Sequence, residues 1–297
     1  MSQALTGQAA APAAPIPDAA RTPLGEVVEA PLTFVVDGGV KPVTRMRPPG
    51  GGEIVREGEY VQKAVQIHDG RALRPAATLD REGFALVKSA TAVTDFADEE
   101  QIRRIYYTEV IRLLTEATGA REVLVFDHTV RRQQGGGPGG RTPVRNAHND
   151  YTERTGPRRV RELMGEAAAE SVLRGRIAQV NLWRPIRGPV ESLPLAVADA
   201  RSVPSEDLIA TDLVYSDRVG EIYQLAYSPD QRWYSYPGMT PDEALLLKGY
   251  DSAIDGRARF TPHTAFDDPN TSPDAAPRES IEVRAFLFFP PEDAPAH

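Results

Sequence analysis

The chain has 297 residues, 41% of them hydrophobic, and a formal net charge of -8, enough for a large core but unsuited to binding polyanionic nucleic acid. No apolar run reaches the roughly 18–20 residues that cross a bilayer, so we expect no membrane span. The chain contains no cysteine, which excludes disulfides, thiolate metal sites and iron–sulfur clusters, and a cytoplasmic location is the default expectation.

Residues 1–30 are rich in Ala and Pro and lack both a basic start and a continuous apolar segment. We therefore expect a disordered tail rather than a signal peptide, followed by a single domain over residues 31–297. Strand patterns come next, at 32–36, 60–68 and 84–87. Apolar residues at three- and four-residue steps then predict a helix over 97–118, which Gly119 ends.

The second half of the chain changes to strands and turns. After an apolar strand at 123–126, the glycine-rich stretch 135–140 cannot hold regular structure, and is either a surface loop or a mobile lid beside a site. A second helix is expected over 157–173, and a short one over 240–249, where Thr240 and Glu243 form a capping box. The remaining strand candidates are 176–184, 192–198, 211–215, 221–227, 231–236, 258–261 and 280–289. Many short strands with a few helices indicate a mainly β sandwich or barrel with helices packed outside.

One pair of residues stands at a spacing that suits a metal. His148 and Asp150 form the chain's one His-x-Asp sequence, and on an extended backbone both side chains point to the same side. A distant imidazole, His263, would complete a 2-His-1-carboxylate site, which suits iron(II) and leaves positions open for substrate and oxygen. By composition, five histidines and 42 acidic residues give roughly 0.7 His-x-Asp/Glu pairs by chance. The pair alone is weak evidence, because a histidine at a strand end is commonly structural.

A second pair, Arg278 and Ser280, lies downstream of His263 at the start of an apolar strand. A guanidinium with a neighbouring hydroxyl on the same strand face can hold the far carboxylate of a small dicarboxylate whose other end binds the metal. The alternative is a salt bridge for Arg278 and a capping role for Ser280.

The whole arrangement resembles the iron(II)- and 2-oxoglutarate-dependent oxygenases, and more narrowly the hydroxylase/desaturase family of microbial secondary metabolism. The segments that carry the resemblance are 148–152 (HNDYT), 181–185 (NLWRP), 194–196 (PLA), 250–252 (YDS), 263–266 (HTAF) and 277–284 (PRESIEVR). The resemblance implies a double-stranded β-helix, a jelly-roll (cupin-like) core with flanking α-helices, its core strands mainly within 120–290. It also implies iron(II) on His148, Asp150 and His263, with 2-oxoglutarate on Arg278 and Ser280. The expected reaction uses O2 to hydroxylate or desaturate a small molecule and releases succinate and CO2.

Candidate substrate contacts lie on two predicted strands. They are Asp127, His128, Arg131, Asn181, Trp183 and Arg184. Each has a structural alternative, since a strand tryptophan is commonly core and an arginine such as Arg184 or Arg284 can simply pair with an acid.

Two other functions fit the same residues. A cupin-like metal dioxygenase or isomerase would use the histidines without 2-oxoglutarate, and would not need Arg278 and Ser280 to face the metal. A non-catalytic jelly-roll binding or accessory protein would bind its ligand with exposed aromatics such as Trp233 and Tyr236.

Overall fold

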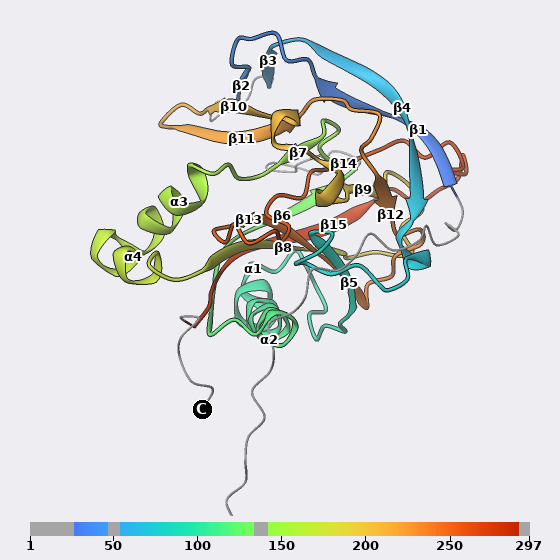
Figure 1. The fold of residues 1–297 in the computed structure, drawn as a ribbon. Helices are drawn as coiled ribbons and strands as arrows, with labels where there is room; N and C mark the ends of the chain where they lie inside the picture. Colours follow the sequence, from blue (N-terminus) through green and yellow to red (C-terminus); the bar gives the residue numbers. More distant parts are fainter. Residues whose placement is uncertain (1–26, 47–53, 134–141, 291–297) are drawn as a thin grey trace, which may run out of the picture.

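The fold is built from two β-sheets in the computed structural model, which describes residues 27–46, 54–133 and 142–290. In sheet order, the ten-stranded sheet contains β1 (Val27–Val35), β4 (Tyr60–Asp69), β12 (Trp233–Ser235), β9 (Leu195–Ala198), β14 (His263–Ala265), β7 (His148–Asn149), β11 (Val219–Leu225), β10 (Leu208–Val214), β2 (Val43–Arg45) and β3 (Val55–Glu57). The five-stranded sheet contains β5 (Phe84–Lys88), β13 (Glu243–Asp251), β8 (Ile177–Pro185), β15 (Glu279–Phe288) and β6 (Glu122–Arg132). The large sheet curls over the small one (Figure 1), and the predicted mainly β jelly-roll core is confirmed.

Helices cover the other face of the small sheet and one side of the molecule. They are α1 (Glu99–Gln101), the π-helical segment η2 (Ile102–Tyr106), α2 (Tyr107–Thr118), α3 (Thr155–Met164) and α4 (Glu166–Val172), with short 3₁₀ turns at η1 (Gly70–Ala72), η3 (Ala200–Ser202) and η4 (Ser205–Asp207). In Figure 1, α1 and α2 lie beneath the small sheet and α3–α4 at its side. The predicted helix over 97–118 matches the first three in sequence, and Gly119 ends it in the left-handed conformation.

Strand β8 shows how the small sheet separates core from site. All of its residues are buried. Ala178, Val180 and Leu182 pack in one cluster with residues of η2 and α2. The alternate residues point the other way, so Trp183 packs against residues of the large sheet and Asn181 reaches Asp150. Because side chains alternate along a strand, one face of the small sheet is left for polar chemistry inside the barrel.

Two predicted helices are corrected. The helix over 157–173 is divided at Gly165, whose φ of 79° no helical residue can adopt. The predicted helix over 240–249 is instead β13, an interior strand of the small sheet. The Thr240–Glu243 capping contacts exist, with the Thr240 N–H donating to the Glu243 carboxylate at 3.1 Å, but they form only a turn. The residues that follow are buried on both faces between β5 and β8, where a continuous apolar run suits a strand.

The tail and several strands begin or end at other residues than the sequence predicted. Residues 27–30 belong to β1, and Ala30 is buried, so the tail is shorter than 1–30; residues 1–26 lie outside the described part. The predicted strand at 258–261 is not one, and β14 begins after Pro262, at His263. Strands β6 to β15 lie within 120–290, the range predicted to hold most core strands, and β1, β4 and β5 join the two sheets from before it. The glycine-rich stretch 135–140 also lies outside the described residues.

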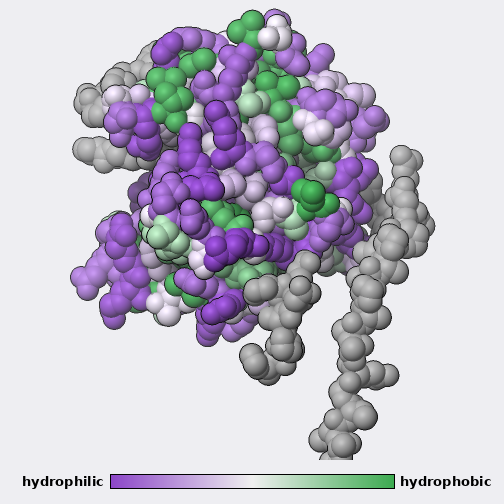
Figure 2. Space-filling model, turned by 60° about the vertical axis from the view of Figure 1, so that its left-hand side comes forward, coloured by the Kyte–Doolittle hydropathy of each residue, from purple (hydrophilic) through white to green (hydrophobic). Residues whose placement is uncertain are grey.

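The surface gives no sign of a membrane-spanning helix. The face shown in Figure 2 is mostly hydrophilic, with its hydrophobic residues in separate small groups. Among the described residues, no helix is both long and apolar enough to cross a membrane.

Candidate active site

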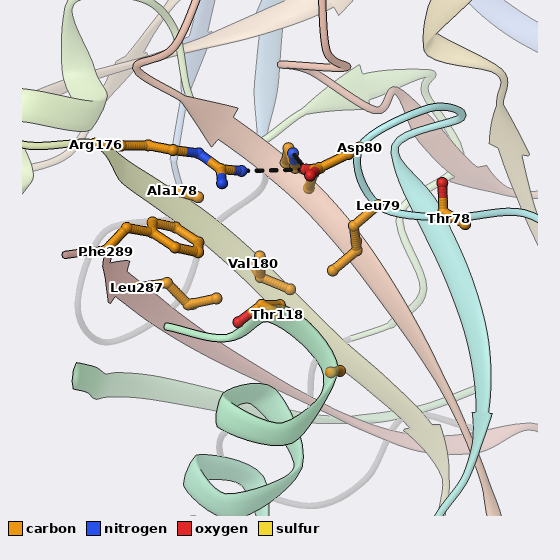
Figure 3. A pocket seen from close by; sticks show the side chains of 11 residues that line it. Thr78, Leu79, Asp80, Thr118, Arg176, Ala178, Val180, Leu287 and Phe289 are labelled. Carbon is orange, nitrogen blue, oxygen red and sulfur yellow. Dashed lines mark hydrogen bonds and ion pairs between the residues drawn. The ribbon is translucent and has the colours of Figure 1, made fainter. Parts of the chain in front are cut away.

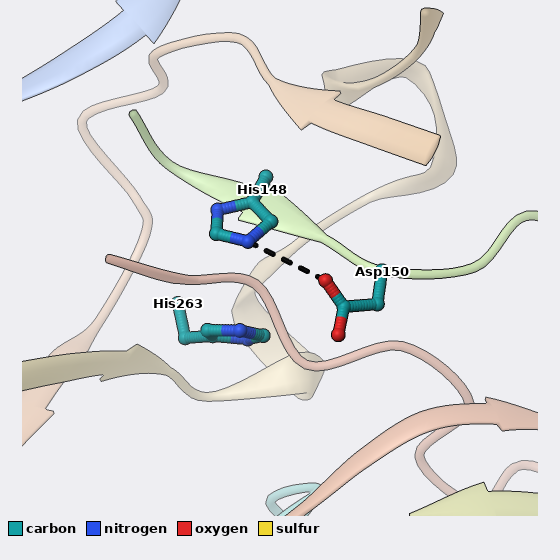
Figure 4. Close-up of side chains that lie close together, drawn as sticks. All are labelled: His148, Asp150 and His263. Carbon is teal, nitrogen blue, oxygen red and sulfur yellow. Dashed lines mark ion pairs between the residues drawn. The ribbon is translucent and has the colours of Figure 1, made fainter. Parts of the chain in front are cut away.

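Three side chains converge inside the barrel, two of them from β14 and β7, the middle strands of the large sheet. Antiparallel pairing of β7 with β14 sets His148 directly opposite His263, and their ring centroids lie 4.7 Å apart. Asp150 follows β7, and its Oδ1 lies 3.5 Å from the Nε2 of His148 (Figure 4). One ligand atom from each of the three residues lies within 4.8 Å of the others. The structure thus brings together the metal ligands that the sequence predicted.

The two imidazoles are held in one tautomer by their own strands. The Nδ1 of His148 donates to the carbonyl of Asn146 at 2.8 Å, and the Nδ1 of His263 donates to that of Thr261 at 3.0 Å. Since a carbonyl only accepts, each Nδ1 carries a proton, which leaves Nε2 as the ring nitrogen available to a metal. Burial, reinforced by the charge of His148, lowers the pKa of His263 and favours its neutral form. An imidazole fixed through Nδ1 in this way binds a metal through Nε2.

Asp150 is ionised, and two side chains of the small sheet donate hydrogen bonds to its carboxylate. Its Oδ2 accepts hydrogen bonds from the Arg284 Nε and the Asn181 Nδ2, both at 2.9 Å. Burial opposes the charge of this carboxylate, but Arg284 and the two histidines outweigh burial and hold the pKa of Asp150 well below its usual value. Asp150 is therefore a carboxylate ligand at neutral pH.

Arg278 and Ser280 lie beside this cluster without the partners a structural role would give them. Arg278 is 3% exposed, stacks over the Trp183 ring at 5.5 Å, and donates to the Leu193 carbonyl. Within the described residues, its Nε and the buried hydroxyl of Ser280 have no hydrogen-bond partner, and no carboxylate forms an ion pair with Arg278. Burial, together with the charge of Arg131, lowers the pKa of Arg278 to about 9, so the group stays cationic at neutral pH. A buried cation and hydroxyl left open in this way fit an anionic ligand.

A small pocket connects the two groups. It is lined by Arg131, Val144, His148, Trp183, Leu195, His263, Thr264, Arg278 and Glu282. The pocket has the metal-type ligands at one part of its wall and the unpaired guanidinium at another. A small dicarboxylate bound by Arg278 would therefore lie within the same cavity as the histidines.

The charges around the triad also suit a divalent cation. Arg284 is surrounded by three carboxylates, those of Asp150, Asp127 and Glu282. One of these carboxylates, Asp150, lies together with the two imidazoles of His148 and His263. That donor set, two imidazoles and one carboxylate, fits iron(II).

Glu282 and the network around Arg284 are the features that the sequence analysis missed. Ser280, Glu282 and Arg284 alternate with buried apolar residues along β15, a strand buried on both faces. Polar residues at every second position of such a strand are a signal that could have identified them.

Four of the six candidate substrate residues lie on the site side of the small sheet, with Asp127 exposed to solvent. Asp127 pairs with Arg284, Asn181 donates to Asp150, and Arg131 and Trp183 line the pocket. Asn181 therefore uses its amide N–H on Asp150, and Asp127 uses its carboxylate on the guanidinium of Arg284.

His128 and Arg184 are corrected, because both face the helices. His128 contacts Tyr107 at 2.8 Å and Glu99 at 3.1 Å. Arg184 is 1% exposed, and donates to the Pro241 carbonyl and the Ser89 hydroxyl on the outer face of the small sheet. Each lies next to an inward-facing residue, and a step of one residue along a strand reverses the face.

The aromatic residues of the alternative binding-module hypothesis are not exposed. Trp233 is 0% and Tyr236 5% exposed, and both pack in the core. They cannot form the surface site that such a module would need.

A second pocket lies on the outer face of the small sheet, where α2 ends (Figure 3). Its floor is apolar, and includes Val180. Its charged side chains are paired: Lys248 and Arg176 contact Asp80 at 2.6 and 3.1 Å, and both also contact Asp251, outside the lining, at 2.8 and 2.7 Å. Within the described residues, none of its lining side chains has an unpartnered buried polar atom. The unpartnered groups that could bind a ligand, on Arg278 and Ser280, lie at the interior pocket instead.

Comparisons with known proteins agree on one family. A family model described as "Oxidoreductase/YMDC permease-like domain" matches residues 32–288. The hydroxylase/desaturase efuI of Hormonema carpetanum is 36% identical over 257 residues, covering 78% of this chain and 85% of that protein. The alpha-ketoglutarate-dependent dioxygenase phiK of a fungal species is 36% identical over 229 residues, 71% of this chain and 79% of that one. The solved structure of the iron and alpha-ketoglutarate-dependent endoperoxidase NvfI superimposes with a TM-score of 0.80 at 29% identity, covering 89% of this chain and 98% of that one.

Proposed function

The chain belongs to the hydroxylase/desaturase family of iron(II)- and 2-oxoglutarate-dependent oxygenases, and we propose that His148, Asp150 and His263 hold its iron while Arg278 and Ser280 hold 2-oxoglutarate. The reaction consumes O2 and 2-oxoglutarate, releases succinate and CO2, and hydroxylates or desaturates a small molecule. We further propose that the two sheets, which lie within residues 27–288, work as one catalytic domain, because both contribute to the site.

One observation carries this assignment. The guanidinium of Arg278 and the hydroxyl of Ser280 are buried with unpartnered polar atoms, and the Arg278 pocket includes both histidines. A buried cation without a counter-ion is costly unless a ligand supplies the anion. A metal enzyme that does not use 2-oxoglutarate has no need for this arrangement.

When bound, iron and 2-oxoglutarate supply the oxidising chemistry, and the protein supplies position and a dry cavity. His148 and His263 offer nitrogen lone pairs, and Asp150 offers one carboxylate oxygen. Trp183 forms the wall against which the guanidinium of Arg278 is stacked. Arg131, which lines the same pocket, and Trp183 are the substrate contacts that we retain from the sequence analysis.

Turnover of 2-oxoglutarate tests the proposal. Apo-protein is reconstituted anaerobically with iron(II), and succinate is measured in air with and without 2-oxoglutarate. We expect slow succinate release in the wild type and none in His148→Ala. Iron-independent release, or release that His148→Ala leaves intact, would refute the metal assignment.

A further inference from the structure

The carboxylate of Asp150 is asymmetric, since its two oxygens face different groups. Oδ1 lies 3.5 Å from the His148 Nε2, on the side of the histidines. Oδ2 accepts two hydrogen bonds from the opposite sheet, from the Arg284 Nε and the Asn181 Nδ2, each at 2.9 Å. One of these donors is charged and the other is neutral.

Both donors are themselves fixed. Asn181 is fully buried, and its Oδ1 accepts from the Gln179 Nε2 at 2.6 Å, which determines which way its amide faces. Arg284 is anchored at its other nitrogens by Glu282, Asp127 and the Thr129 hydroxyl. Neither side chain can follow Oδ2 if the carboxylate rotates, so rotation would break both hydrogen bonds.

Resting on the proposed function, we propose that Arg284 and Asn181 are positioning residues that keep Oδ2 of Asp150 away from the metal. Asp150 then binds iron through Oδ1 alone. A carboxylate that bound through both oxygens would occupy one more coordination position, and that position is needed for 2-oxoglutarate, which binds a metal through two oxygens. Arg284 and Asn181 therefore matter for the affinity for 2-oxoglutarate rather than for the affinity for iron.

Two substitutions test this division of roles. Asn181→Leu removes the neutral donor at similar volume, and Arg284→Lys keeps the charge but replaces the planar fork with a single point donor. Thr129→Val is the matched control, because Thr129 contacts the same guanidinium at 3.3 Å without touching Asp150. Three quantities are measured anaerobically: the melting temperature, the iron(II) dissociation constant, and the 2-oxoglutarate dissociation constant of the iron-loaded protein.

Loss of an outer-shell partner typically costs about 10–100-fold in metal affinity or activity. The proposal assigns this loss to the cosubstrate, so we expect both variants to bind 2-oxoglutarate about tenfold or more weakly, and iron(II) within about threefold of the wild type. Thr129→Val should leave both constants unchanged. Folded variants that bind 2-oxoglutarate as the wild type does would overturn the proposal. So would a tenfold loss of iron affinity at an unchanged melting temperature, because the donors would then serve only to aim the carboxylate at the metal. If Asn181→Leu does not fold, Arg284→Lys carries the same test. A wild type that binds neither iron nor 2-oxoglutarate would instead refute the proposed function.

Discussion

The Asn149 side chain accepts a hydrogen bond at its Oδ1 from the Thr261 N–H, at 3.0 Å, and so joins the two segments that carry the histidines. The amide nitrogen of Asn149 donates to the carbonyls of Tyr151 and Gly249, at 2.7 and 2.8 Å. Asn149 lies between His148 and Asp150 but points away from them, and is fully buried. The spacing of the metal ligands therefore depends on a residue that does not touch the metal.

Replacing Asn149 should affect both stability and metal binding. Asn149→Ala leaves a buried N–H and two carbonyls unpaired, so we expect the free energy of unfolding to fall by about 2–5 kcal/mol. We also expect iron(II) to raise the melting temperature less than it does in the wild type. Asn146→Ala is the control, since only the backbone of Asn146 contacts His148. Urea unfolding and anaerobic thermal melts measure the two effects; full iron-induced stabilisation in Asn149→Ala would show that the ligand geometry does not depend on this amide.

Ser280→Ala should separate ligand binding from stability. The buried hydroxyl makes no hydrogen bond within the described structure, so its removal costs no native contact. We expect unfolding free energy to change by less than about 0.5 kcal/mol, or to rise slightly. Loss of a hydrogen bond to 2-oxoglutarate should raise the KM for 2-oxoglutarate roughly two- to tenfold. A destabilised Ser280→Ala protein with an unchanged KM would mean that the hydroxyl is structural.

Arg184 should behave in the opposite way. Its guanidinium is buried on the helix-covered face, where it donates to Pro241 and Ser89. Arg184→Met keeps the aliphatic stem but leaves these partners without a donor, and should lower the free energy of unfolding by about 1–3 kcal/mol. The KM for 2-oxoglutarate, measured below the melting transition, should not change. An altered KM in the folded variant would return Arg184 to the list of site residues.

The ion pair between Arg71 and Glu243 predicts a pH dependence of stability. The hydrogen bond from Arg71, at 2.8 Å, outweighs burial and lowers the pKa of Glu243 to about 2. A carboxyl whose folded pKa is depressed stabilises the protein above its unfolded pKa, and this contribution is lost as the pH falls through the interval between the two values. The stability difference between wild type and Arg71→Gln should therefore be largest near pH 6, at about 1–2 kcal/mol, and shrink below pH 4. Urea unfolding between pH 3 and pH 7 measures it, and a difference that is constant across this range would rule out the linkage.

Local patterns were enough to find the central residues of the site. The His148-x-Asp150 and Arg278-x-Ser280 spacings rely only on side-chain alternation along an extended backbone, which holds here although Asp150 follows β7 and Arg278 precedes β15. His263 could be added because a second imidazole was required, and the pairing of β7 with β14 then places it opposite His148.

The failures involve long-range information. Whether His128 and Arg184 face the barrel or the helices depends on which side of the small sheet the helices cover, and no local pattern specifies this. β13 resembles a capped helix locally, and becomes a strand because β5 and β8 pair with it from both sides. The Arg284 network needs β6, β8 and β15 side by side with the segment that follows β7, so its members are dispersed along the chain.

The most direct test of the account is the visible charge-transfer absorption of iron(II) with 2-oxoglutarate, recorded without oxygen. We expect wild-type protein with both components to show this band. His148→Ala should lack it at every concentration of 2-oxoglutarate. Arg278→Ala should show the band only at 2-oxoglutarate concentrations about tenfold higher or more, because a charge-assisted hydrogen bond to 2-oxoglutarate is lost. Absence of the band in the wild type, or a band that Arg278→Ala shows at the same concentration, would contradict the assignment of this pocket to iron and 2-oxoglutarate.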